Sequence, residues 1–326
     1  MLYVLVVRRK NIERDRKTAD LKPRWQLLLT RAASGAEIEL PPLAGEDKKI
    51  VFKIWYQAQQ TLKETAAEEL ISVGRQLGFK KLAAELVENS SRLDDLLGAI
   101  GGLGILEAEE HEGKILEYFE NENAILSLVA AGALLKINPE KHVPRIIKEM
   151  GCRDTWPEDR VAGMLAEINP QLIVDIFKKK LEDISPESSS RCIKILIRLA
   201  PAEAADVIEK LLKTNRGVEE VSVCLYGAAE LGHPRLLDLA KEYLEHDEFY
   251  VRLQATRAVG KLGGDEEKET IIKSLRDGNW WVRLRAAQAL ADLPGIDREE
   301  LKRLSREHPD KFSRQIMNQV LQEKKI

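Results

Sequence analysis

The sequence contains few of the residues that build disulfide frameworks, β-sheets and membrane spans. Three cysteines in 326 residues, odd in number and far apart, argue against a secreted disulfide scaffold and fit a reducing compartment. Aromatic residues are only 5% of the chain and charged residues 32%, which favours helices over a β-sandwich or barrel. Beyond the N-terminus, the longest apolar stretch, residues 125–135, is too short to cross a bilayer. The composition therefore predicts an all-α, cytoplasmic protein.

The motifs of common catalytic and cofactor sites are also missing. The sequence has no P-loop, no GxGxxG and no GxSxG, and its cysteines lack CxxC spacing. The five histidines are scattered, and only His111-Glu112 forms a His-Glu pair. The glycines at 101, 102 and 104 fall inside a helical pattern, where they suit close packing and not phosphate binding. We therefore predict no enzyme activity, no catalytic residue, no cofactor and no metal site.

Charge is distributed unevenly along the chain. The sequence has 51 Lys and Arg against 54 Asp and Glu, a net charge of −3, so nothing overall calls for nucleic acid as a partner. Residues 1–31 hold nine basic and three acidic residues, 9 − 3 = +6, which leaves −9 for the remainder. Residues 1–7 are apolar and span only about 10 Å as a helix, and Arg8, Arg9 and Lys10 follow them.

Two interpretations of this N-terminus remain open. An apolar segment followed by basic residues is typical of the cytoplasmic end of a transmembrane helix that begins upstream. The alternative is a frayed terminus or a short strand. In either case we interpret residues 1–24 as a basic lead-in, flexible or close to an anionic membrane surface.

An internal repeat organises the rest of the chain. Successive differences of 31, 31, 31, 32, 31 and 31 residues separate seven apolar anchor positions, which are Leu106, Ile137, Ile168, Leu199, Leu231, Leu262 and Leu293. Seven residues before each anchor the side chain is small (Ala, Val or Cys), and three residues before it the side chain is apolar. Offsets of −7, −3 and 0 lie on one face of an α-helix.

A second amphipathic run follows each anchor, so every unit is predicted to be a helix pair. Pro139, Pro170 and Pro201 stand two residues past three of the anchors, where proline suits a new helix start. Neither helix of a pair can bury its apolar face alone, so the units must stack into a solenoid. We expect seven pairs over residues 91–310, with neighbouring first helices approaching closely at the small −7 positions.

The two C-terminal units carry a family resemblance. Residues 247–263 and 277–290 contain Asp, then Val-Arg, then Ala-x-x-Ala-Val or Ala-x-x-Ala-Leu, and this pattern resembles the HEAT repeat. The short period is similar to that of bacterial HEAT-like repeats, including those of phycobilin lyases. The five earlier units keep the apolar positions but lack Val-Arg.

The resemblance implies an α-α superhelix that acts as a non-catalytic protein–protein interaction scaffold. A helical cap at residues 25–90, after a basic lead-in, resembles bacterial HEAT-repeat proteins tethered to the cytoplasmic face of the membrane. Residues 311–326 would form a C-terminal capping helix. The alternative is an enzyme or chaperone on the same scaffold, either chromophore-lyase-like or DNA-glycosylase-like. A glycosylase needs a strongly basic face, which the acidic repeat region disfavours.

One group of residues is a candidate partner-binding site. Twelve residues before an anchor stand Trp156, Tyr250 and Trp281, with Phe249 and Trp280 beside the last two, and Arg252 and Arg283 follow two residues later. Aromatic and Arg side chains that alternate along a repeat edge suit partner binding. The alternative is structural. Asp247 or Asp277 would bond with these arginines between units, while one aromatic of each pair packs under the turn.

Overall fold

The computed structural model describes residues 2–62, 65–180, 186–214 and 217–324. Every regular element in these ranges is a helix, so the predicted all-α fold is confirmed. The described residues form two compact units, one ending at His142 and the other beginning at Val143. This boundary falls inside α8 (Pro139–Cys152).

The first unit contains the predicted cap and the first repeats. Its helices are α1 (Leu2–Ala33), α2 (Gly45–Gln59), α3 (Thr65–Gln76), α4 (Phe79–Asn89), α5 (Leu93–Ile105), α6 (Glu112–Phe119) and α7 (Ala124–Ile137). Rings from α2 and α4 form its centre: Phe52 and Trp55 stack with centroids 5.8 Å apart, and Phe79 lies 5.4 Å from each. A Cβ at Gly102 of α5 would lie 2.8 Å from the Phe52 ring. This glycine therefore serves close packing, as its helical context predicts.

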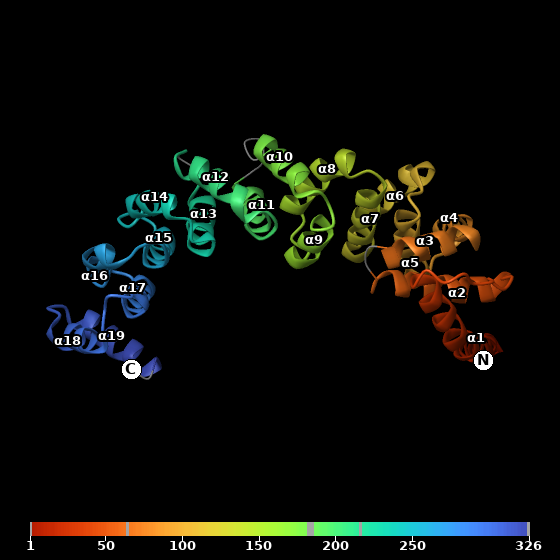
Figure 1. Ribbon diagram of the computed structural model, residues 1–326, viewed down its shortest axis with the longest axis horizontal. Helices are drawn as coiled ribbons and strands as arrows, with labels where there is room; N and C mark the ends of the chain where they lie inside the picture. The colour runs from red at the N-terminus through yellow and green to blue at the C-terminus, as the bar shows by residue number, and fades with distance from the viewer. Residues whose placement is uncertain (1, 63–64, 181–185, 215–216, 325–326) are drawn as a thin grey trace. The chain divides into compact units, whose positions relative to one another are not determined.

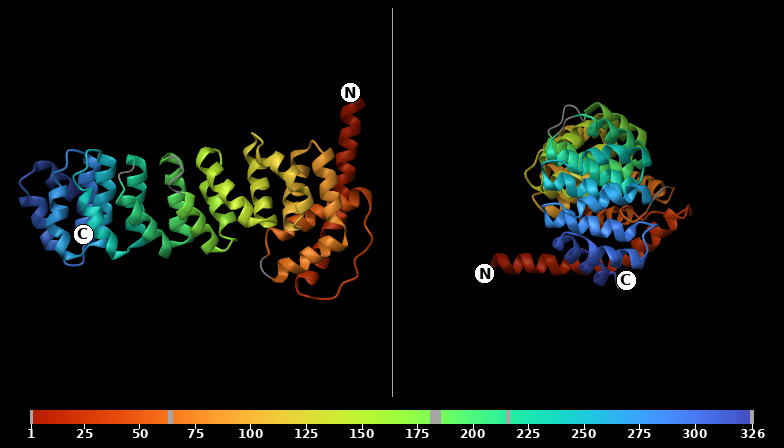
Figure 2. Two further views of the ribbon diagram at one scale, coloured as in Figure 1. Left: turned by 90° about the horizontal axis from the view of Figure 1, so that it is seen from above. Right: turned by 90° about the vertical axis from the view of Figure 1, so that its left-hand side faces the viewer.

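The N-terminal helix differs from the prediction. α1 runs without interruption from Leu2 to Ala33, so the boundary predicted between residues 24 and 25 lies inside it. Only Trp25, Leu29 and Ala32 of its described side chains are buried, and its first turns extend beyond the rest of the unit (Figure 2). Lys, Arg, Glu and Leu are good helix formers, which favours a helix over residues 12–24, where no side chain is buried. No helix in the described part of the chain is long and apolar enough to cross a membrane.

The second unit is a regular stack of helix pairs. These are α9 (Glu158–Leu165) with α10 (Pro170–Lys180), α11 (Pro186–Leu199) with α12 (Pro201–Leu212), α13 (Val218–Leu231) with α14 (Leu237–Glu242), α15 (Phe249–Leu262) with α16 (Lys268–Ser274), and α17 (Trp280–Asp292) with α18 (Arg298–Glu307). α19 (Lys311–Glu323) packs beside α17 and α18. Figure 1 shows the first helices of these pairs (α11, α13, α15 and α17) in one row and the second helices (α12, α14, α16 and α18) in another.

The repeat positions form the core. All seven side chains at the −7 position and all seven at −3 are fully buried. Neighbouring first helices also approach closely at positions that the sequence analysis does not single out. The −2 residue of one first helix faces the −4 residue of the next. A Cβ at Gly260 would lie 2.4 Å from Ala289 Cβ, and a Cβ at Gly227 would lie 2.4 Å from Ile197 Cδ1.

Candidate functional site

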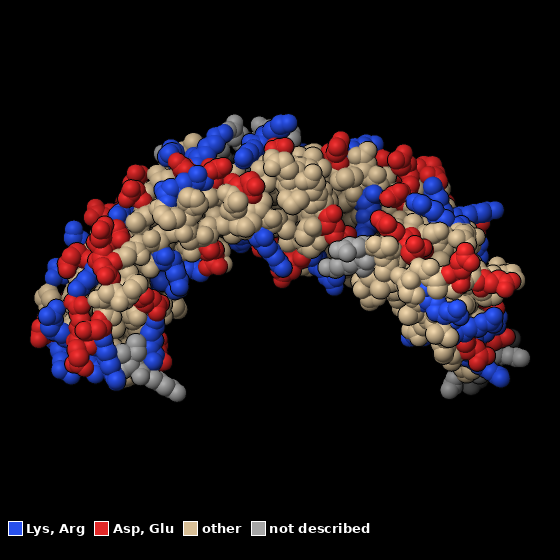
Figure 3. Space-filling view, viewed as in Figure 1, with Lys and Arg blue, Asp and Glu red and all other residues tan. Residues whose placement is uncertain are grey.

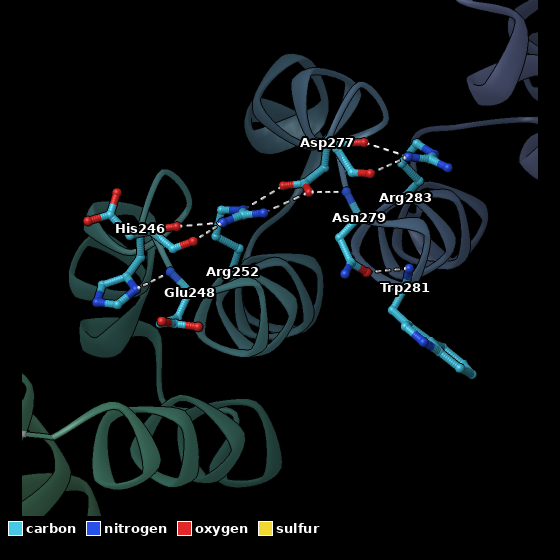
Figure 4. A network of polar contacts seen from close by, with 9 residues as sticks. His246, Glu248, Arg252, Asp277, Asn279, Trp281 and Arg283 are labelled. Carbon is cyan, nitrogen blue, oxygen red and sulfur yellow. Dashed lines mark hydrogen bonds and ion pairs between the residues drawn. The ribbon is translucent and has the colours of Figure 1, made fainter.

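An arginine–aspartate pair joins the starts of α15 and α17. Arg252 Nε donates to Asp277 Oδ2 at 2.7 Å, and its Nη2 donates to Asp277 Oδ1 at 3.0 Å. Arg252 Nη1 also donates to the carbonyl oxygens of His246 and Asp247, both at 2.7 Å. Figure 4 shows the guanidinium between its own preceding turn and the turn of the next repeat. The structure therefore contains the bond between repeat units that the structural alternative predicts, between Arg252 and Asp277.

The same network orders the first turn of α17. Asp277 Oδ1 accepts from Asn279 N at 2.7 Å, and Asn279 Oδ1 accepts from Trp281 N at 2.9 Å. Arg283 Nη1 donates to the carbonyls of Asp277 and Gly278 at 2.7 and 3.1 Å, as Arg252 does one repeat earlier. Hydrogen bonds with the side chains of Asp277, Asn279 and Arg283 thus fix the backbone at and before the start of α17 (Figure 4).

The electrostatics of the pair agree with this geometry. Burial raises the pKa of Asp277, but hydrogen bonds from Arg252 and from Asn279 N–H, with the nearby positive charges, lower it below its ordinary value overall. The hydrogen bond to Asp277 in turn raises the pKa of Arg252. Both groups are charged at neutral pH, which is the state that gives a bidentate pair its strength.

The arginine pattern continues one repeat beyond Arg283. Arg314 Nη1 donates to the carbonyls of His308 and Pro309 at 2.6 and 3.1 Å. Arg314 lies 31 residues after Arg283, so the period itself carried the signal. The apolar anchors end at Leu293, so the anchor positions alone do not extend to Arg314, which the sequence prediction missed.

The exposed aromatic side chains line the starts of three successive first helices. Tyr250 of α15 is 57% exposed, Trp280 and Trp281 of α17 are 40% and 56% exposed, and Phe312 of α19 is 49% exposed. We call these four residues the aromatic ridge. Phe312, 31 residues after Trp281, was missed for the same reason as Arg314. Arg283 Cζ lies 5.4 Å from the Phe312 ring centroid, and this contact links α17 to α19.

The remaining two predicted aromatics lie elsewhere. Phe249 is half-buried, with its ring centroid 3.9 Å from that of Tyr250. Trp156 is only 1% exposed, and Arg191 Nη2 donates to its carbonyl oxygen at 2.7 Å. It precedes α9, which begins at Glu158, so its indole belongs to the core and not to the ridge.

Exposed apolar residues elsewhere follow the same pattern. Outside α1, every large hydrophobic side chain that the structure describes as exposed stands at the first or second residue of a first helix. Beyond the ridge these are Leu93, Ile125 and Val218. The fold itself gains nothing from this exposure. Charges of both signs are interspersed over α14 to α18 (Figure 3).

A mixed polar and apolar hollow of about 700 Å³ lies along α11, α13 and α15. Lys194 and Arg198 supply positive charge, Glu158 and Glu230 negative charge, and Tyr226 an aromatic surface. No group of three or more His, Cys, Asp or Glu in the described ranges could hold a metal ion. Cys192 and Cys224 are fully buried, and burial raises the pKa of the Cys192 thiol to about 12, so it is not a nucleophile at neutral pH.

Comparison with known proteins addresses the repeats. The HEAT repeats family matches residues 222–291. A crystal structure of an engineered protein is similar over 95% of this chain and 96% of that chain, with 14% sequence identity and a TM-score of 0.37. No curated protein sequence matches. The matched residues 222–291 contain α15 and α16, so the resemblance to HEAT repeats that the sequence predicts is confirmed there.

Proposed function

We propose that this protein is a non-catalytic scaffold that binds a protein partner through the aromatic ridge. HEAT repeats are interaction modules, and the ridge lies on repeats α15 and α17 and on α19. The observation that supports the site is the repeated exposure of large aromatic rings in one register. Clustered exposed apolar surface marks interaction sites, and Trp and Tyr are enriched among the residues that dominate binding energy.

The hydrogen-bond network supports this proposal because it prepares the ridge for binding. Side chains and loops that become ordered on binding cost free energy. Here Arg252, Asp277 and Asn279 already fix the backbone from which Trp281 projects. The arginines are therefore proposed as positioning residues, while the exposed rings make the contact.

The experiment compares two double variants as baits with the wild-type chain. Tyr250→Ser/Trp281→Ser removes the ridge, whereas Leu93→Ser/Ile125→Ser removes exposed apolar residues from equivalent helix starts in the first unit. A protein that wild type and the Leu93/Ile125 variant retain, but the ridge variant loses, would support the proposal. Identical sets of bound proteins for all three baits would refute it.

We further propose that α1 holds the protein at the cytoplasmic face of a membrane. No described side chain between residues 12 and 24 is buried, and the first 31 residues carry +6. Each basic residue near an anionic surface contributes about 1 kcal/mol. Reversing Arg16 and Lys22 to Glu should therefore weaken binding to phosphatidylglycerol vesicles by about 30-fold or more at low salt.

A matched control for this experiment lies in the second unit. Lys178 and Lys179 are exposed on α10, so reversing them to Glu changes the net charge of the protein by the same amount. In a flotation assay, the Arg16/Lys22 variant should no longer float with the vesicles, whereas the Lys178/Lys179 variant should float as wild type does. Equal flotation of the two variants, or no flotation of wild type, would eliminate membrane attachment through α1.

A further inference from the structure

The spacing of the ridge restricts the conformation of what it can bind. Tyr250, Trp281 and Phe312 occupy the same position on three successive first helices. The Cβ expected at Gly260 would lie 2.4 Å from Ala289 Cβ, which shows direct packing of α15 on α17. Helices packed in this way have axes about 8–10 Å apart. The rings should therefore recur at about that interval along the ridge.

A polyproline II segment repeats its face at the same interval. It has three residues per turn and rises about 3.1 Å per residue, so one face recurs about every 9.3 Å. A β-strand repeats its face about every 6.8 Å, and one turn of α-helix rises about 5.4 Å. Either would place further side chains between the rings. A polyproline II segment would place one side chain against each ring and none between.

The chemistry of the ridge also suits proline. Proline-rich segments dock on surfaces lined by aromatic side chains, because their conformation is already fixed and costs little entropy to bind. Trp280 and Trp281 are exposed, and each carries an indole N–H. These groups can donate to the free carbonyl oxygens of a polyproline II backbone, which makes no internal hydrogen bonds.

The charges at the two ends of the ridge determine which end of the segment should be basic. Glu219 on α13 lies 31 residues before Tyr250, so it occupies the next step of the same register, and it is exposed. Asp247 and Glu248 are exposed beside Tyr250. At the opposite end, Lys311 Nζ lies 4.9 Å from the Phe312 ring centroid. One end of the ridge is thus acidic and the other basic.

We propose that the aromatic ridge binds a proline-rich segment in polyproline II conformation, with a basic residue one step beyond the prolines. The pattern is Arg-x-x-Pro-x-x-Pro-x-x-Pro, in which the prolines face Tyr250, Trp281 and Phe312 and the Arg faces Glu219. This rests on the proposed function, since it names the class of partner for the same surface.

The test uses fluorescein-labelled peptides and the full chain. The first peptide has the pattern above, with Ala and Ser at the x positions. The second has the same composition but places proline at every second position. Fluorescence anisotropy should show tighter binding of the first peptide. Trp281→Ala should weaken that binding by about tenfold or more, Trp281→Phe should restore most of it, and Ile125→Ala should have no effect.

The charged end has its own test. Glu219→Gln should weaken the peptide that carries Arg, but should not change the affinity of the same peptide with Ala in place of Arg. Equal affinity for the two proline spacings would overturn the inference, and so would an affinity that does not depend on Trp281. Thermal unfolding curves that match wild type would show that the variants are folded.

Other occupants of the ridge would give different results. Sedimentation velocity that shows self-association of wild type, lost in Trp281→Ala, would identify a second copy of the chain and overturn the inference. If the peptides fail to bind while the baits still capture a partner that depends on Tyr250 and Trp281, the polyproline inference is wrong and the scaffold function stands. If neither depends on the ridge, both are wrong.

Discussion

Two glycine substitutions in the second unit should change stability in opposite directions. A Cβ at Gly260 of α15 would lie 2.4 Å from Ala289 Cβ and 3.4 Å from Ala289 Cα, whereas a Cβ at Gly163 of α9 would meet nothing within 4 Å. Both glycines lie inside helices, where alanine is intrinsically favoured by about 0.5–1 kcal/mol. The two sites therefore share the propensity gain and differ only in packing.

The magnitudes follow from these contacts. Gly163→Ala should raise the free energy of unfolding by about 0.5–1 kcal/mol. At Gly260 the added methyl group must push α15 away from α17, and such overpacking costs about 1–3 kcal/mol. After the propensity gain is subtracted, Gly260→Ala should lower the free energy of unfolding by up to about 2.5 kcal/mol.

Urea unfolding followed by far-UV circular dichroism measures both effects. Because repeat arrays can unfold in more than one step, the midpoints should be compared together with the slopes. If Gly260→Ala were as stabilising as Gly163→Ala, the close approach of neighbouring first helices at the −2 and −4 positions would be refuted.

Two further predictions concern protonation. The pKa of Asp277 is below its ordinary value in the folded protein, so its stabilising effect should be complete above about pH 4, near the pKa of an unfolded Asp, and fade as the pH falls through the lower folded pKa. Asp277→Asn should accordingly be less stable than wild type at neutral pH, with a difference that narrows in acid; a difference independent of pH in urea melts would contradict this. Thiol titration of the native protein should modify exposed Cys152 quickly and buried Cys192 and Cys224 only after denaturation. Rapid labelling of all three cysteines would contradict the burial of Cys192 and Cys224.

Much of the second unit could be predicted from the sequence because one period governs it. Leu165, Leu196, Val259 and Leu290, each at the −3 position, are all fully buried, as helical periodicity requires. The contacts between the −2 and −4 positions could not be predicted in the same way. Ile197 faces Gly227 in one interface and Gly260 faces Ala289 in another. The sizes of the facing residues therefore differ from one interface to the next, and neither position has a uniform residue type.

The candidate site shows where the period misleads. Trp156 and Trp281 occupy the same register position, but α17 begins at Trp280 whereas α9 begins only at Glu158. One tryptophan therefore projects from a first helical turn, and the other lies in the preceding loop and packs inward. Helix boundaries depend on local caps, such as the Asn279 side chain that accepts from Trp281 N, and period alone does not specify them.

The N-terminus shows a different limit. Its residues carry no repeat, and no side chain of residues 12–24 is buried, so neither periodicity nor core formation indicated where a helix would begin. Helix propensity alone favours the continuous α1 (Leu2–Ala33). That contribution is small per residue, and the composition-based boundary at residue 24 did not include it.

The indole N–H resonances of the five tryptophans test the central claim most directly. Trp25, Trp55 and Trp156 are buried, and Trp55 Nε1 donates to Leu70 O at 2.6 Å, whereas Trp280 and Trp281 are exposed on the ridge. Adding the Arg-x-x-Pro-x-x-Pro-x-x-Pro peptide, or the partner captured by the bait, to ¹⁵N-labelled protein should shift the signals of Trp280 and Trp281 and leave the other three in place. If a bound partner leaves both ridge indoles unshifted, it does not bind at the aromatic ridge.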